Sequence, residues 1–207
     1  MGGHKAGDVA SREAIERFVK YACTTHMSDP ANILDAGIIS VNKDIFDMAN
    51  SNRDYSGMGT TFVAASLVEN HVYIANVGDS RLYLIGRDIR QITRDHSLVE
   101  DMVRMGVLER EEARTHYKKN VITKAIGVAD DKTSTPDIFE IEVENGDKLL
   151  LCSDGLTNMV EDYDIKKIVK DNDSIEDAVR ELIKQANENG GKDNISAILI
   201  EPEIGEE

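Results

Sequence analysis

The chain has 207 residues, of which 41% are hydrophobic, so its length suits one domain with a sizeable core. The formal net charge is −15 and the nearest approach to a basic cluster is Lys118-Lys119, so a nucleic-acid partner is not expected. No apolar run approaches the roughly 18 residues of a membrane-spanning helix. The only two cysteines, Cys23 and Cys152, lack metal-site spacing and favour a reducing compartment, by default the cytoplasm.

The first quarter of the chain is predicted to form two amphipathic helices. Residues 9–26 place apolar side chains at helical spacing, namely Ile15, Phe18, Val19 and Ala22. Asp29-Pro30 predicts an N-cap followed by proline at the first helical position. Behind it, apolar residues repeat at intervals of four and three up to about residue 50, namely Leu34, Ile38, Val41, Ile45 and Met48. Two such helices must cover another layer of structure.

The middle of the chain is predicted to supply that layer as short β-strands. Residues 60–68 and 71–77 predict a hairpin around Glu69-Asn70, and strands follow at 81–85 and 89–92. A helix is expected at 97–105 and another helical turn or two at 109–114, and residues 115–132 are interpreted as a surface flap.

The last third alternates strands and helices. Residues 137–143 and 148–152 are predicted to pair with each other around Asn145-Gly146-Asp147, and 194–200 is the last predicted strand. Helices are expected at 162–169 and 174–189, the second with Glu176 and Arg180 as an i,i+4 pair. Strands grouped between helices favour antiparallel sheets with helices outside over a parallel βαβ sheet.

Three acidic motifs each lie where an apolar run gives way to a glycine-marked turn. They are Gly78-Asp79-Ser80-Arg81, Ser153-Asp154-Gly155 and Gly191-Lys192-Asp193-Asn194. An Asp at a strand end holds its carboxylate at a rigid rim, which suits a hard divalent cation. A structural interpretation stays open for each: Asp154 as a helix cap, Asp193 in a turn before an edge strand, and Asp79 in a turn paired with Arg81.

These motifs, together with Met1-Gly2-Gly3-His4 and Gly57-Met58-Gly59-Thr60-Thr61, resemble the type 2C (PPM-type) serine/threonine protein phosphatases, and the bacterial branch is the better match. The resemblance runs over essentially the whole chain. It implies an α+β fold, an antiparallel β-sandwich of two sheets flanked by helix pairs in four layers. Residues 1–201 would form a single domain, and 202–207 an acidic tail.

The resemblance also implies the chemistry. Two Mn²⁺ or Mg²⁺ ions would activate a hydroxide that attacks phosphorus directly. Asp154 and Asp193 match metal ligands of the family, and Asp79 matches a ligand of a third, weaker ion. No catalytic residue is expected beyond the metal ligands.

The remaining motif residues are expected to be structural. Gly57, Gly59 and Thr60 would permit close backbone approach and begin a strand. Gly2 and Gly3 have no side chain that can bind a metal, and His4 is expected to stabilise its loop by a hydrogen bond. The other four histidines share no ligand spacing, namely His26, His71, His96 and His116.

The chain departs from the family at its start. The family's metal loop reads Asp-Gly-x-Gly-Gly-His, and Met1 occupies the x position, so the Asp shared between two metals would precede Met1. We therefore expect an N-terminally truncated domain that lacks strands, exposes sheet edges and is weakly active or inactive.

The leading functional hypothesis is hydrolysis of phosphoserine and phosphothreonine in proteins. The expected partners are phosphorylated proteins, including a eukaryotic-like serine/threonine kinase, and the chain is expected to be a monomer that binds no membrane. Two alternatives remain: a non-catalytic relative that binds phosphoproteins, and a phosphatase of anti-sigma antagonist proteins.

Overall fold

The structure of the protein is a computed structural model that describes residues 6–129 and 135–205. The chain forms two compact units. The first unit comprises Met1–Ser66, Tyr73–Asp79 and Asp95–Glu140, and the second comprises Leu67–Val72, Ser80–Arg94 and Ile141–Glu207. The expectation of a single domain over residues 1–201 stays a prediction. No helix in the described part of the chain has the length and apolar content needed to span a membrane.

The first unit contains the two predicted N-terminal helices and most of a three-stranded sheet. Its helices are α1 (Gly7–Thr24), α2 (Pro30–Ser51), the short 3₁₀ helix η1 (Arg53–Tyr55), α3 (Leu98–Arg104) and α4 (Arg110–Ala113). The sheet has the order β1-β2-β5, with β1 at Phe62–Val68, β2 at His71–Val77 and β5 at Asp137–Glu142. The predicted hairpin between β1 and β2 is confirmed, and Glu69 at its turn has a positive φ of 56°.

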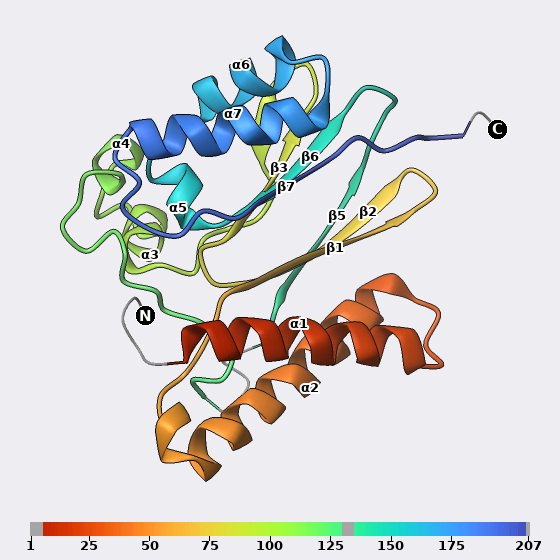
Figure 1. Cartoon of the computed structure of the whole chain (residues 1–207), viewed down its shortest axis with the longest axis vertical. Helices are drawn as coiled ribbons and strands as arrows, with labels where there is room; N and C mark the ends of the chain where they lie inside the picture. Colours follow the sequence, from red (N-terminus) through yellow and green to blue (C-terminus); the bar gives the residue numbers. More distant parts are fainter. Residues whose placement is uncertain (1–5, 130–134, 206–207) are drawn as a thin grey trace. The chain divides into compact units, whose positions relative to one another are not determined.

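The helix pair α1–α2 packs against β1 and β2 through one apolar core (Figure 1). The predicted cap of α2 is confirmed, because the Asp29 carboxylate accepts a hydrogen bond from the Asn32 N–H at 2.8 Å. The predicted inward face of α1 is wrong in part: Ile15 and Val19 are 57% and 52% exposed. Helix α1 instead buries Ala10 and Ala14, because small side chains let it lie close to α2.

The second unit contains the remaining sheet and its covering helices. Its strands are β3 (Arg81–Ile85), β4 (Ile89–Gln91), β6 (Lys148–Cys152) and β7 (Ala197–Ile200), in the order β4-β3-β6-β7 and all antiparallel. The helices are α5 (Asp154–Thr157), α6 (Asp162–Asp171) and α7 (Ile175–Glu188), and α6 and α7 lie side by side (Figure 1). Tyr83, Leu150 and Leu199 are in register across three strands and belong to the core that these helices cover.

The fold class is therefore α+β with two antiparallel sheets and helix pairs, as predicted. The predicted pairing of 137–143 with 148–152 is wrong, because β5 and β6 belong to different sheets. The burial patterns give the reason. Strand β6 is buried at four successive positions, which suits a place between β3 and β7, whereas β5 alternates between half-buried and exposed residues.

The acidic tail forms hydrogen bonds near its end with the turn that precedes β6. Asn145 donates a hydrogen bond to the Ile204 carbonyl at 3.2 Å and accepts one from the Ile204 N–H at 3.0 Å. Lys148 also lies 3.4 Å from the Glu201 carboxylate. The tail residues up to Ile204 are therefore held by the turn that precedes β6.

The Tyr83 side chain is completely buried, and its hydroxyl joins two charged side chains. It accepts a hydrogen bond from Arg81 Nη1 at 2.8 Å and donates one to Asp162 Oδ1 at 3.0 Å. Burial raises the pKa of Tyr83 above its ordinary value, so the hydroxyl stays protonated and can donate to Asp162.

Replacing Tyr83 by Phe should lower the free energy of unfolding by about 1–2 kcal/mol, because the hydrogen bonds to Arg81 and Asp162 are lost in the core. Urea unfolding measures this, and Tyr163→Phe is the matched control, since Tyr163 is 74% exposed. Equal stabilities of the two variants would contradict the assignment.

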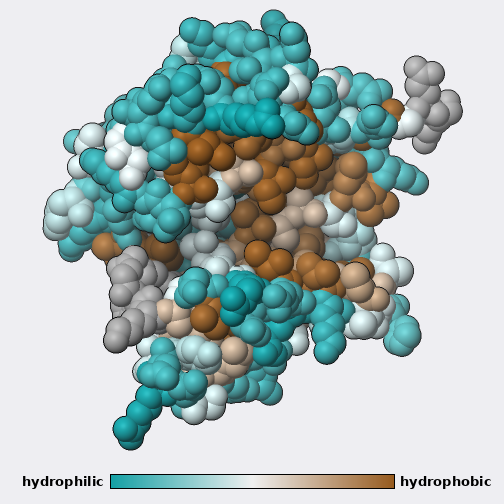
Figure 2. Space-filling model, in the orientation of Figure 1, coloured by the Kyte–Doolittle hydropathy of each residue, from teal (hydrophilic) through white to brown (hydrophobic). Residues whose placement is uncertain are grey.

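Strand β7 is the edge of its described sheet and carries exposed apolar side chains. Figure 2 shows hydrophobic surface gathered along this strand, where Ile198 and Ile200 are 60% and 38% exposed. An exposed hydrophobic edge is a template for pairing with another chain.

Replacing Ile198 by Lys should reduce self-association at high protein concentration, because a charged edge residue opposes strand pairing. Sedimentation velocity over a concentration series is the measurement. Tyr163→Lys adds the same charge at an exposed position of α6 and should leave self-association unchanged. A similar decrease in both variants would show that net charge, and not the strand edge, controls association.

Candidate metal centre

Asp154 lies directly beyond the buried strand β6, in the first turn of the short helix α5. It is half-buried, and its Oδ2 accepts a hydrogen bond from Asn158 Nδ2 at 3.1 Å. Asn158 is the residue that ends α5. The carboxylate is therefore oriented by a neighbour one helical turn away.

Asp193 lies between α7 and β7, after a turn made by two glycines with positive φ, Gly190 at 131° and Gly191 at 50°. The turn is fixed because the Gly191 N–H donates to the Ala186 carbonyl at 3.1 Å. Asp193 is exposed, and its Oδ1 accepts a hydrogen bond from the Asn194 N–H at 2.8 Å.

The structure brings the backbones of these two segments together. Strands β6 and β7 are antiparallel neighbours, so the end of β6 lies beside the start of β7. Beyond the last paired residues, the Ser153 N–H donates to the Ser196 carbonyl at 3.0 Å, and the Ser196 N–H donates to Ser153 Oγ at 3.0 Å. Ser153 Oγ also donates to the Asn194 carbonyl at 3.2 Å.

Gly155 permits this approach because it has no side chain. A Cβ at Gly155 would lie 2.2 Å from the Asn194 carbonyl oxygen and 3.5 Å from the Asp193 carbonyl oxygen. The first distance is far inside van der Waals contact, so no other residue fits without backbone movement. The glycine of the Ser-Asp-Gly motif thus holds Asp154 next to the segment that carries Asp193.

Two carboxylates can attract a divalent cation but do not complete its shell, since hard cations take about six oxygen ligands. Within residues 6–129 and 135–205, no group of three or more His, Cys, Asp or Glu side chains is placed to hold a metal ion. A cation held by Asp154 and Asp193 would therefore need water or other oxygen ligands besides these two carboxylates.

Asp79 belongs to the first unit, directly after β2, and is 8% exposed. Gly78 before it has a φ of +111°, and a Cβ there would lie 2.4 Å from Thr61 Cγ2. A nearly buried carboxylate is costly unless it is paired or bound to a cation, so the burial of Asp79 agrees with the turn interpretation and with the metal interpretation alike.

His96, to which the sequence assigned no role, contacts this loop. Its Nδ1 accepts a hydrogen bond from the Gly78 N–H at 3.0 Å. Nε2 lies 3.3 Å from Asp137 Oδ2, although the N–H is poorly aligned for a hydrogen bond. Burial and the nearby Lys124 lower the pKa of His96, so the ring is mainly neutral at pH 7. Burial opposes ionisation of Asp137, but the ion pair with Lys124 at 3.2 Å acts in the other direction, and the pKa of Asp137 is lowered.

The other predicted motif residues have structural roles in the fold or lie outside the described residues. Met58 is completely buried in the core of the first unit, and Thr60 forms an isolated β-bridge with Ile126. Gly2, Gly3 and His4 lie outside the described residues.

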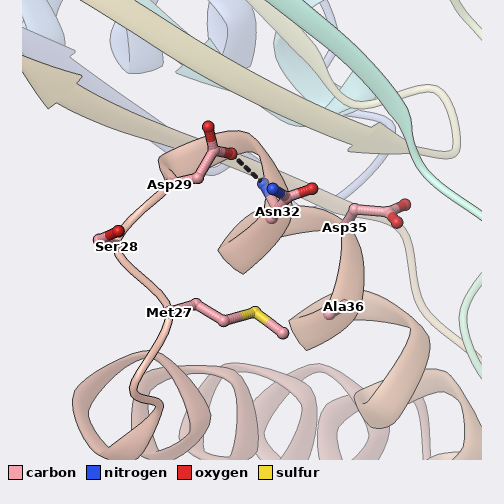
Figure 3. A pocket seen from close by; sticks show the side chains of 6 residues that line it. All are labelled: Met27, Ser28, Asp29, Asn32, Asp35 and Ala36. Atoms are coloured by element: carbon pink, nitrogen blue, oxygen red, sulfur yellow. Dashed lines mark hydrogen bonds between the residues drawn. The ribbon is translucent and has the colours of Figure 1, made fainter.

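A surface hollow at the start of α2 is separate from the predicted metal residues. Figure 3 shows Asp29 engaged with the Asn32 N–H as the helix cap, and Asp35 pointing in another direction. The hollow is lined by Met27, Ser28, Asp29, Asn32, Asp35 and Ala36. Since its two carboxylates do not converge, it is not the metal site.

Replacing Gly155 by Ala should lower the free energy of unfolding by about 1–3 kcal/mol, because the added methyl group overlaps the Asn194 carbonyl oxygen. It should also weaken Mn²⁺ binding, since Asp154 and Asp193 are pushed apart. Thermal unfolding and calorimetric Mn²⁺ titration test both effects. Gly205→Ala is the control, because no atom lies within 4 Å of its added Cβ. A Gly155→Ala protein that matches this control in both measurements would contradict the assignment.

Comparison with known proteins identifies the family of the chain. Residues 1–195 match the family model of protein phosphatase 2C. The chain is 44% identical to the serine/threonine phosphatase stp of Listeria innocua, over 97% of this chain and 81% of that protein. It is 36% identical to the protein phosphatase PhpP of Streptococcus pneumoniae, over 97% of this chain and 82% of that protein.

Solved structures lead to the same family. The serine/threonine phosphatase Stp1 from Staphylococcus aureus matches with a TM-score of 0.92 and 42% identity, over 98% of this chain and 81% of that chain. The catalytic domain of the phosphatase PstP, in complex with two manganese ions, matches with a TM-score of 0.84 and 32% identity, over 96% of this chain and 83% of that chain. The chain therefore belongs to the protein phosphatase 2C family.

Proposed function

We propose that the chain is a serine/threonine protein phosphatase whose Asp154 and Asp193 bind divalent cations for the hydrolysis of phosphate esters in proteins. The observation that carries the proposal is the close backbone contact of the Asp154 and Asp193 segments, which Gly155 permits. Family membership supports the reaction class.

The two aspartates are suited to this role because their carboxylates are oriented before any ligand arrives. Asn158 holds one oxygen of Asp154, and the Asn194 N–H holds one oxygen of Asp193. When bound, a pair of divalent cations supplies a water of lowered pKa and neutralises charge on the phosphoryl oxygens. The residues themselves need only hold the cations in place.

We further propose that Asp79 binds an additional, weaker cation. Its support is the resemblance of Gly78-Asp79-Ser80-Arg81 to the family motif. Mn²⁺ is the first ion to test, since the related PstP domain was solved with two manganese ions.

The proposed substrates are phosphorylated proteins, including a serine/threonine kinase whose products the chain would dephosphorylate. The proposed compartment is the cytoplasm, in agreement with two free thiols, Cys23 and Cys152.

Replacing Asp193 by Ala should lower Mn²⁺-dependent hydrolysis of a phosphothreonine peptide by a factor on the order of a hundred. The loss of a carboxylate that binds the cation should weaken cation binding at least as much as the loss of a residue that only supports such a ligand. The unsubstituted chain and Asp193→Ala are assayed with Mn²⁺ and with EDTA. Each is also assayed with Asp-Gly placed ahead of Met1, which supplies the remaining loop carboxylate of the family pattern.

Asp164→Ala is the matched control, since Asp164 is an exposed carboxylate of α6 in the same unit. Its activity should equal that of the unsubstituted chain. Undiminished turnover in Asp193→Ala would remove Asp193 from the metal site. Phosphopeptide binding without Mn²⁺-dependent hydrolysis in either form of the chain would favour the non-catalytic alternative.

A further inference from the structure

His96 makes two hydrogen bonds to a single residue, Gly78. Its ring nitrogen Nδ1 accepts from the Gly78 N–H at 3.0 Å, and its backbone N–H donates to the Gly78 carbonyl at 3.0 Å. The same carbonyl also accepts a hydrogen bond from Asn76 Nδ2 at 3.1 Å. A residue held at both its N–H and its carbonyl cannot rotate without breaking one of these bonds.

The opposite side of Gly78 is closed by packing. A Cβ on this residue would overlap Thr61, at 2.4 Å from Cγ2 and 3.1 Å from Cα. Gly78 is therefore fixed between Thr61 and His96, and the next residue in the chain is Asp79. The direction in which the Asp79 carboxylate leaves the backbone depends on how firmly Gly78 is held.

The His96 ring is itself held in one orientation. Because Nδ1 accepts a hydrogen bond, the proton of the neutral ring belongs on Nε2. Nε2 lies 3.3 Å from the Asp137 carboxylate, whose other oxygen accepts a hydrogen bond from Lys124 Nζ at 3.2 Å. A carboxylate beside Nε2 favours the tautomer that leaves Nδ1 free to accept from Gly78.

His96 also joins the loop to the segment beyond α4. The His96 carbonyl accepts a hydrogen bond from the Thr123 N–H at 2.8 Å, and Ser97 forms a β-bridge with Ile122. His96 therefore connects the end of β2, the start of β5 through Asp137, and Thr123.

We propose that His96 is a positioning residue for Asp79: by holding Gly78 at two points, it directs the Asp79 carboxylate toward a divalent cation. This inference rests on the metal role proposed above for Asp79. It assigns His96 no contact with the cation or the substrate.

Two substitutions at His96 separate the contact with Gly78 from the contact with Asp137. In His96→Asn, the side-chain oxygen can occupy the place of Nδ1 and accept from the Gly78 N–H. In His96→Gln, the amide reaches toward Asp137 but leaves no acceptor at the Nδ1 position. If His96 only stabilised the fold, the Mn²⁺ affinities of the two variants would not differ in the way that the Gly78 hydrogen bond predicts.

The readouts are calorimetric Mn²⁺ affinity of the full chain and hydrogen exchange of the Gly78 amide by NMR. We expect His96→Gln to weaken the Mn²⁺ binding that depends on Asp79 about tenfold, and to speed exchange of the Gly78 amide. His96→Asn should stay within about twofold of the unsubstituted chain, since the acceptor is kept. Equal Mn²⁺ affinities of the two variants would overturn the proposal.

Asp79→Asn supplies the reference. In that background, His96→Gln should have no further effect on Mn²⁺ affinity, because the two residues act on the same cation. An unchanged Mn²⁺ affinity in Asp79→Asn would overturn both the metal role of Asp79 and this inference. The test on Asp193 is independent of that outcome. An effect of His96→Gln that persists in Asp79→Asn would overturn the positioning role alone.

A second measurement needs no substitution, in case His96→Gln does not fold. In the unsubstituted chain, the ¹⁵N resonance of His96 Nδ1 should be that of an unprotonated acceptor, and Mg²⁺ should slow exchange of the Gly78 amide. A protonated Nδ1, or Gly78 exchange that Mg²⁺ leaves unchanged, would overturn the proposal.

Discussion

The contact between the chain after β6 and the chain before β7 is the constraint on which the candidate metal centre depends. Antiparallel pairing places the two segments together, and hydrogen bonds between Ser153 and Ser196 extend the pairing past the strands. The missing side chain of Gly155 then lets the backbone reach the Asn194 carbonyl. The sheet therefore brings the backbones that carry Asp154 and Asp193 close together.

Asp79 is held in a similar way in the first unit. Gly78 beside it approaches Thr61 closely, as Gly155 beside Asp154 approaches Asn194. In both places, a glycine next to the acidic residue removes the Cβ that would keep two backbone segments apart. The net charge of −15 says only that carboxylates are abundant. Fixed backbones, and not abundance, distinguish these carboxylates from exposed ones such as Asp164.

Much of the fold could be predicted from the sequence because hydrophobic spacing and turn residues are local signals. Asp29-Pro30 marks the start of α2, and Glu176 and Arg180 lie 3.5 Å apart as an i,i+4 pair.

Strand pairing is not a local property of the sequence. A turn at Asn145-Gly146-Asp147 is typical of a hairpin, yet it leads from one sheet to the other, and only the different burial of β5 and β6 explains this. The exposed Ile15 and Val19 show the same limit, since packing with α2 selects the buried face. The sequence assigns His96 no role because its partner Gly78 contributes only backbone atoms, which leave no pattern in a sequence.

Crystals soaked in Mn²⁺ and measured at the manganese absorption edge give the most direct test. Anomalous difference density should show an ion bound by carboxylate oxygens of both Asp154 and Asp193, within about 2.5 Å of each oxygen ligand. Density that lies away from both side chains, with the carboxylates turned apart, would contradict the proposal that Asp154 and Asp193 form a metal centre.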